Sequence, residues 1–190
     1  MEPRAVFHLS RMPWAITLAA SALLVTGCSM PPAPGATARA RGTASIMPTT
    51  AINPNPTMGT VAFTALDHGV RVAGEVRGLP PGSEHGFHIH EKGDCSTNGD
   101  ASGGHFNPGG NVHGKFSAPG THAGELPSLV ADANGVARFS AEVHSISMDE
   151  GAVNNVIGRA IVVHRDKDDF TTQPAGNSGP RVGCAVIRRG

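Results

Sequence analysis

Short apolar runs separated by turn residues constrain the fold of this chain more than any other feature. Gly59–Leu66 (GTVAFTAL) and Val70–Val76 (VRVAGEV) flank the turn Asp67-His68-Gly69. Comparable runs cover residues 85–91, 129–131, 136–143, 156–165 and 181–188. Runs of this length between turn signals predict strands, and Asn134-Gly135 marks a hairpin. With no convincing helical pattern, the sequence predicts an all-β antiparallel sandwich or barrel.

Two segments between the predicted strands are long and irregular. Residues 93–127 and 166–180 carry many Gly, Pro and Asn residues and little periodicity. Long loops in a folded domain are often functional, so we expect functional residues there.

The N-terminal residues have the features of a secretory signal. Arg4 and Arg11 precede an apolar stretch over residues 13–27 that ends in small residues. Its strongly apolar part is too short for a comfortable membrane span of about 20 residues. Val25–Cys28 (VTGC) resembles the bacterial lipobox, in which the cysteine is lipidated and becomes the mature N-terminus. We therefore expect a signal peptide over 1–27. The alternative is an ordinary signal peptide with Cys28 as an incidental thiol.

The Pro-rich segment after Cys28 predicts a tether. Residues 28–56 lack periodicity and cannot bury enough apolar surface to fold, so we expect a disordered tether over 28–56 and a domain over 57–190. The expected location is the periplasm, with a lipid anchor in the membrane. Ser29, rather than Asp, follows Cys28, which favours the outer membrane if the cell is Gram-negative.

Charge argues against nucleic acid as a partner. The whole chain has 15 Lys and Arg and 15 Asp and Glu, a formal net charge of zero. The predicted domain alone has 11 basic and 14 acidic residues, a net charge of −3. Binding through phosphate neutralisation needs a basic surface, so no nucleic-acid partner is expected.

The domain contains two cysteines, Cys95 and Cys184. An even pair in an exported protein predicts one disulfide. In the chain-entropy model, closing a loop of this length stabilises the fold by ~4–5 kcal/mol.

The histidines follow a pattern that favours metal binding. His88 and His90 share one face of a predicted strand, roughly 6.6 Å apart, while Phe87 and Ile89 point to the core. A lone pair would more often be two solvated histidines, but further candidates lie in or beside the loops. They are His105, His113, His122, Glu125 and His164. Imidazole suits copper and zinc, so the set predicts a metal site.

Five segments of the domain together resemble copper/zinc superoxide dismutase. They are GFHIHEKGDCS (86–96), GGHFNP (103–108), HAGELP (122–127), GRAIVVH (158–164) and GNSGPRVGCAVI (176–187). The resemblance spans almost the whole domain and implies an eight-stranded antiparallel Greek-key β-sandwich or barrel with two long functional loops. The lipobox and Lys92 look like the bacterial exported branch.

The resemblance also implies roles for single residues. It implies copper ligands at His88, His90, His105 and His164, and zinc ligands at His105, His113, His122 and Glu125. His105 would bridge the two metals, and Asp168 would link a copper histidine to a zinc histidine. Arg181 would lie at the mouth of the copper channel, and Cys95 and Cys184 match the family disulfide. The family has Asp at the position of Glu125, so we expect Glu125 to ligate zinc with somewhat lower affinity.

The implied activity is dismutation of superoxide to oxygen and hydrogen peroxide, which would protect the cell envelope. Copper would carry the electron, His105 would take up a proton, and Arg181 would hold the anion, with Lys92 a candidate for steering. Two alternatives are a copper-carrying domain of this fold and a structural cell-surface sandwich with incidental histidines. The resemblance is compatible with a monomer and with a homodimer.

Overall fold

The computed structural model describes residues 39–49 and 55–190. The predicted signal peptide, Cys28 and the tether up to residue 38 lie outside this range. Within the described residues, no helix has the length and apolar character required to cross a membrane.

Ten strands and one short helix make up the described domain. The strands are β1 (Arg41–Pro48), β2 (Met58–Ala65), β3 (Val70–Arg77), β4 (Glu84–His85), β5 (Phe87–His90), β6 (Leu129–Val130), β7 (Val136–Val143), β8 (Ala160–His164), β9 (Arg181–Val186) and β10 (Arg188–Arg189). The helix η1 (Thr97–Ser102) is a 3₁₀ turn inside the first long loop. The sequence had predicted no helix, and η1 contains left-handed backbone at Asn98 and Gly99, so no helical periodicity could reveal it.

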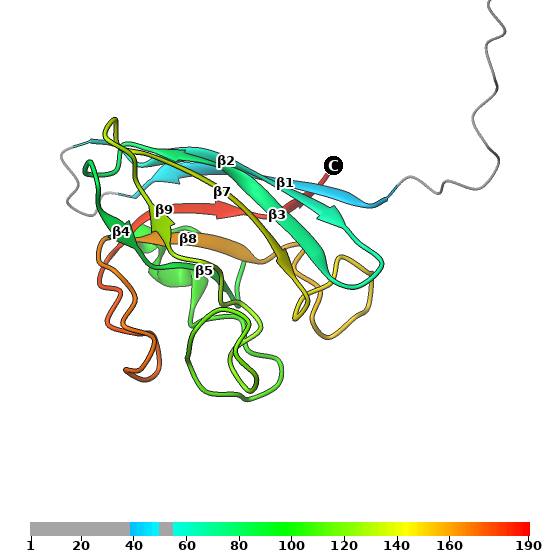
Figure 1. Cartoon of the computed structure of the whole chain (residues 1–190). Helices are drawn as coiled ribbons and strands as arrows, with labels where there is room; N and C mark the ends of the chain where they lie inside the picture. The colour runs from blue at the N-terminus through cyan, green and yellow to red at the C-terminus, as the bar shows by residue number, and fades with distance from the viewer. Residues whose placement is uncertain (1–38, 50–54) are drawn as a thin grey trace, which may run out of the picture. The chain divides into compact units, whose positions relative to one another are not determined.

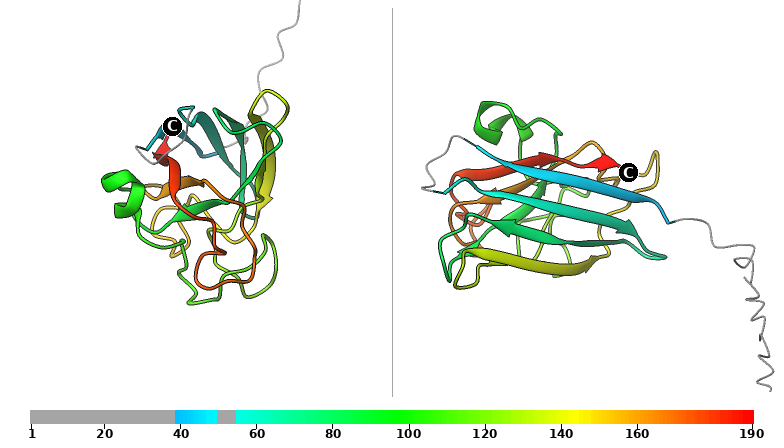
Figure 2. Two further views of the ribbon diagram at one scale, coloured as in Figure 1. Left: turned by 90° about the vertical axis from the view of Figure 1, so that its left-hand side faces the viewer. Right: turned by 90° about the horizontal axis from the view of Figure 1, so that it is seen from above.

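The strands pair antiparallel in the order β5-β8-β9-β1-β2-β3-β7, with β10 beside β1 and a separate β4-β6 pair. Figure 1 shows the sheet curling over, so that β1, β2, β3 and β7 lie above β5, β8 and β9. Figure 2 shows the same curl from the side and from above. The predicted all-β antiparallel fold class is confirmed.

The hydrophobic core lies between the two halves of the curled sheet. Phe63 and Val72 contribute from one half, and Phe87, Ile89 and Ile161 from the other. Alternation along β5 sends Phe87 and Ile89 inward, as the sequence predicted, and turns His88 and His90 to the opposite face. The two long loops cover that face, so these histidines are buried as well.

The predicted tether over 28–56 is wrong where strand β1 lies. The sequence predicts a disordered segment over residues 41–48, but they form a strand paired with β2, β9 and β10. Gly42, Ala44 and Ile46 are buried, while the residues between them are exposed. The domain therefore begins before residue 57, since β1 joins the two halves of the sheet.

Candidate metal centre

Backbone pairing brings the predicted ligands together around β5. His88 pairs with Val162 of β8, and on its other side the segment around Glu125 forms an isolated antiparallel bridge with it. Gly124 permits this approach, because a Cβ there would lie 2.3 Å from the carbonyl oxygen of Ile89. The β8–β9 ladder shifts register between Val163 and His164, so His164 lies opposite Arg181.

Four histidines form the first group, with one ring nitrogen of each lying within 4.8 Å of the others. They are His88, His90, His105 and His164. The outer nitrogens of three rings donate to oxygen: His88 Nε2 to Asp168 Oδ2 (2.8 Å), His90 Nδ1 to the Gly103 carbonyl (2.9 Å) and His164 Nδ1 to the Gly179 carbonyl (3.0 Å). In a neutral ring the second nitrogen then carries a lone pair. These inner nitrogens therefore face one another as acceptors.

Converging lone pairs without a donor fit a metal ion. His90 Nε2 and His164 Nε2 are 3.3 Å apart, and His88 Nδ1 and His105 Nε2 are buried without a hydrogen-bond partner. Burial lowers the pKa of His164 to about 4. The pKa values of His88 and His90 lie well below the ordinary value, mainly because of burial and secondly because of the charges of neighbouring histidines. The rings are thus held neutral, which is the form that binds metal.

A second group surrounds one oxygen of Glu125. Its Oε1 lies 3.1 Å from His105 Nδ1, 3.0 Å from His113 Nδ1 and 2.7 Å from His122 Nδ1. The His122 nitrogen is not aligned for a hydrogen bond, despite the short distance. Four donors bound tetrahedrally to zinc would lie about 3.3 Å apart, close to these separations. The donor set therefore fits zinc, and His105 belongs to both groups.

The charge of this second group depends on its hydrogen bonds. Burial raises the pKa of Glu125, but the hydrogen bond from His105 and the close ring of His122 outweigh it and lower that pKa to about 2. Burial also lowers the pKa of His113, whereas its hydrogen bond to Asp168 and the charge of Glu125 raise it overall. Glu125 is thus anionic at neutral pH, as a zinc ligand must be.

Asp168 connects the two groups from outside. It accepts from His88 Nε2 at 2.8 Å and from His113 Nε2 at 2.9 Å. Gly176 makes room for this link, because a Cβ there would lie 1.9 Å from Asp168 Oδ1 and 2.5 Å from His113 Nε2. Its φ of 63° also favours glycine. Carboxylates in this position fix the orientation and tautomer of metal-binding histidines.

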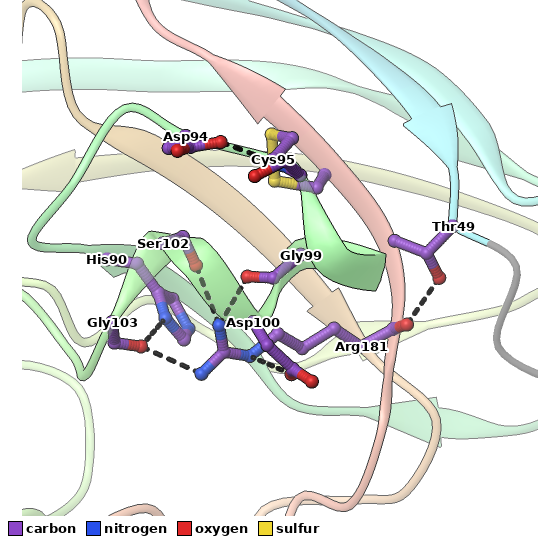
Figure 3. Close-up of a disulfide and its surroundings, with 11 residues drawn as sticks. Thr49, His90, Asp94, Cys95, Gly99, Asp100, Ser102, Gly103 and Arg181 are labelled. Atoms are coloured by element: carbon purple, nitrogen blue, oxygen red, sulfur yellow. Dashed lines mark hydrogen bonds and ion pairs between the residues drawn. A yellow bond between two sulfur atoms is a disulfide. The ribbon is translucent and has the colours of Figure 1, made fainter.

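Arg181 is held by the loop that contains η1 (Figure 3). Its Nη1 donates to the Gly99 carbonyl and to Ser102 Oγ, and its Nη2 donates to the Gly103 carbonyl at 2.7 Å. The predicted Cys95–Cys184 disulfide is present and joins this loop to β9. The loop that orients Arg181 also orients His90, because both donate to the Gly103 carbonyl.

A pocket of about 670 Å³ opens onto the first group. His90, His105, His164 and Arg181 line it, together with Glu91 and Asp100. Arg181 is the only cationic side chain among the lining residues apart from histidine. Lys92, the candidate for steering, does not line the pocket, and its Nζ lies 3.9 Å from Glu91.

The structure brings the seven predicted metal ligands together in the two predicted groups, with Asp168 and Arg181 beside them. Whether each one binds its metal stays a prediction. Sequence reasoning missed the backbone acceptors of Gly99, Gly103 and Gly179, because carbonyl groups carry no residue signature. It also missed Asp100, which lies 3.8 Å from Arg181 Nε and could have been noticed only as an acidic residue in the first loop.

Comparison with known proteins agrees with this geometry. The family model for copper/zinc superoxide dismutase matches residues 57–187. A protein of Paramecium bursaria Chlorella virus 1 named superoxide dismutase [Cu-Zn] is 39% identical over 143 residues, 72% of this chain and 75% of that protein. Superoxide dismutase [Cu-Zn] 2 of Aquifex aeolicus is 37% identical over 135 residues, covering 69% and 79%.

Solved structures share the fold. A crystal structure of the clock protein EA4 has a TM-score of 0.69 and 37% identity, covering 81% of this chain and 97% of that one. A SOD-like protein from Bacillus subtilis has a TM-score of 0.66 and 32% identity, covering 75% and 95%. The two histidine groups and these relatives support copper and zinc as the metals of the site. The chain belongs to the copper/zinc superoxide dismutase family.

Proposed function

We propose that this protein dismutates superoxide to oxygen and hydrogen peroxide. The observation that carries the proposal is the set of inward lone pairs on the first histidine group, which opens to a pocket beside a fixed arginine. Copper held by His88, His90, His105 and His164 supplies the one-electron redox chemistry that zinc lacks. Zinc held by His105, His113, His122 and Glu125 has a structural role.

The side chains around the pocket bind the substrate and supply a proton. Arg181 presents a positive charge to the superoxide anion, and its three hydrogen bonds hold the guanidinium beside the pocket. His105 lies between the two groups, and its Nε2 is free of hydrogen bonds. When this nitrogen is not bound to metal, it can carry a proton toward reduced substrate.

Metal analysis combined with a superoxide-consumption assay tests the proposal. We expect copper and zinc to be bound in equal amounts, with turnover that is lost when copper is removed. Arg181→Gln should retain both metals and lower kcat/KM by roughly tenfold, the lower end of the range for a hydrogen bond to a charged group. Copper bound without turnover would contradict the proposal and favour the alternative of a copper-carrying domain.

We further propose that the protein is exported, anchored by a lipid on Cys28 and protects the cell envelope from superoxide. The support is the signal-like stretch over 13–27 and the lipobox-like Val25–Cys28. Labelling of cells with radioactive palmitate should mark the wild-type protein and leave Cys28→Ala unlabelled. A Cys28→Ala protein that is labelled as strongly as the wild type would contradict the anchor.

A further inference from the structure

The pocket that opens onto the copper histidines has an unusual charge balance for an anion site. Its lining contains two carboxylates, Glu91 and Asp100, but only one side chain with a permanent positive charge, Arg181. Glu91 has its own cationic neighbour in Lys92, with 3.9 Å between Oε1 and Nζ. Asp100 faces Arg181, with 3.8 Å between Oδ1 and Nε.

Arg181 does not depend on Asp100 for its position. Gly99, Ser102 and Gly103 accept hydrogen bonds from the two terminal nitrogens, and Asp100 lies beside the remaining one, Nε (Figure 3). Within the described residues, the Asp100 carboxylate accepts no hydrogen bond and has no ion-pair partner other than Arg181. Its side chain is 73% exposed, whereas that of Arg181 is 18% exposed. The carboxylate therefore acts on Arg181 by charge and contributes little to its orientation.

We propose that Asp100 weakens the attraction of anions to the copper pocket by partly cancelling the charge of Arg181. This inference rests on the proposed function for its consequence on superoxide, but its effect on anions in general follows from charge alone. A carboxylate at this distance lowers the positive potential that an incoming monoanion meets, and salt screens part of that effect. Asp100 thus limits the rate of substrate capture.

The variant Asp100→Asn tests the proposal, with Glu150→Gln as its control. Both changes remove one negative charge from an exposed residue, but Glu150 does not line the pocket. The first measurement is the dissociation constant of azide, a small monoanion that binds cupric ion, followed by its charge-transfer absorption in the copper-loaded protein. We expect Asp100→Asn to lower this constant by roughly two- to fivefold at low ionic strength, and Glu150→Gln to leave it nearly unchanged.

The second measurement is kcat/KM for superoxide over a range of ionic strength. Asp100→Asn should raise it by a similar factor at low salt, with the gain shrinking as salt increases. If Asp100 acted only by holding Arg181 in position, Asp100→Asn would have a lower kcat/KM and weaker azide binding than the wild type. That result would overturn the proposal. Equal azide dissociation constants for Asp100→Asn and Glu150→Gln would also overturn the proposal.

The two measurements separate this proposal from the proposed function. If the copper-loaded wild type bound azide but consumed no superoxide, the proposed function would be wrong. The azide constants would still decide the role of Asp100, because they require copper and an open pocket but no turnover. A second variant, Asp100→Ser, should reproduce the effect of Asp100→Asn, since both remove the charge.

Discussion

Hydrogen-bond acceptors outside the metal groups decide which ring nitrogen of a histidine is available to a metal. Where an oxygen accepts from the outer nitrogen, as the Gly179 carbonyl does for His164, the inner nitrogen keeps its lone pair. Glu125 is different, because its own oxygen lies among the three ring nitrogens of the second group. Its longer side chain, where the family has Asp, still reaches the shared position.

Glu125→Ala should weaken zinc binding by more than about 100-fold, since even partners that do not touch the metal contribute 10–100-fold. Glu125→Asp, which restores the family's residue, should bind zinc at least as tightly as the wild type. Titration of metal-free protein with zinc in the presence of a competing chelator gives the constants, with Glu150→Ala as control. Unchanged zinc affinity in Glu125→Ala would show that Glu125 is not a ligand.

Gly176→Ala should disturb both histidine groups, because it displaces the Asp168 carboxylate that links them. The added Cβ would collide with Asp168 Oδ1 and His113 Nε2, and φ is positive at this position. The link from Asp168 to His113 must lengthen, so we expect zinc affinity to fall by about 10–100-fold. Gly120→Ala is the matched control, because its φ is 75° but no atom lies within 4 Å of its Cβ position. Equal zinc affinities for the two variants would contradict the role of Asp168.

At the scale of elements, periodicity and turn residues predicted most of the sheet but not β1. The hairpin of β2 and β3 was located to within a residue or so, because alternation and Asp67-His68-Gly69 coincide. The inward face of β1 consists of Gly42, Ala44 and Ile46, which carry little apolar signal, and a Pro-rich sequence surrounds it. Its pairing with β9 joins Met47 to Cys184 and Pro48 to Gly183, residues far apart in the chain, which no local pattern records.

A chain that starts at Thr57 should therefore be severely destabilised. Removing β1 exposes unpaired edges on β2 and β9 and removes the buried side chains of Ala44 and Ile46. Loss of a buried isoleucine side chain alone typically costs about 2–5 kcal/mol. Urea unfolding followed by circular dichroism checks this, with a chain starting at Arg39 as control. Equal unfolding midpoints for the two chains would contradict the assignment of β1 to the domain.

At the scale of the whole molecule, the fold buries a set of neutral bases behind two loops. Six histidines and two carboxylates lie buried on the outer face of β5 and β8, away from the hydrophobic core. Protonation of His88, His90 or His164 would place a positive charge in a buried position. Burial therefore opposes protonation of these rings. The stability of the metal-free protein should therefore depend strongly on pH, because the unfolded chain takes up protons that the buried rings do not.

We expect the metal-free protein to lose stability as pH falls from about 6.5 to about 4. The pKa of His164 is lowered from 6.5 to about 4, so in this window the unfolded chain binds a proton that the folded chain does not. Stability then rises with pH, and His164 alone contributes on the order of 3 kcal/mol. The lowered pKa values of His88 and His90 act in the same direction, whereas the raised pKa of His113 opposes them just above 6.5. Glu125 extends the loss below pH 4.5, because its pKa is lowered to about 2.

Urea unfolding of the metal-free protein at a series of pH values, with the disulfide intact, measures this loss directly. His164→Gln should flatten the curve between pH 6.5 and 4, because an amide does not titrate. His144→Gln is the matched control, since His144 is an exposed histidine outside both groups. A wild-type curve that is flat across this window would show that the folded, metal-free protein protonates His164 as readily as the unfolded chain does. Burial would then not keep these rings in the neutral form that binds metal.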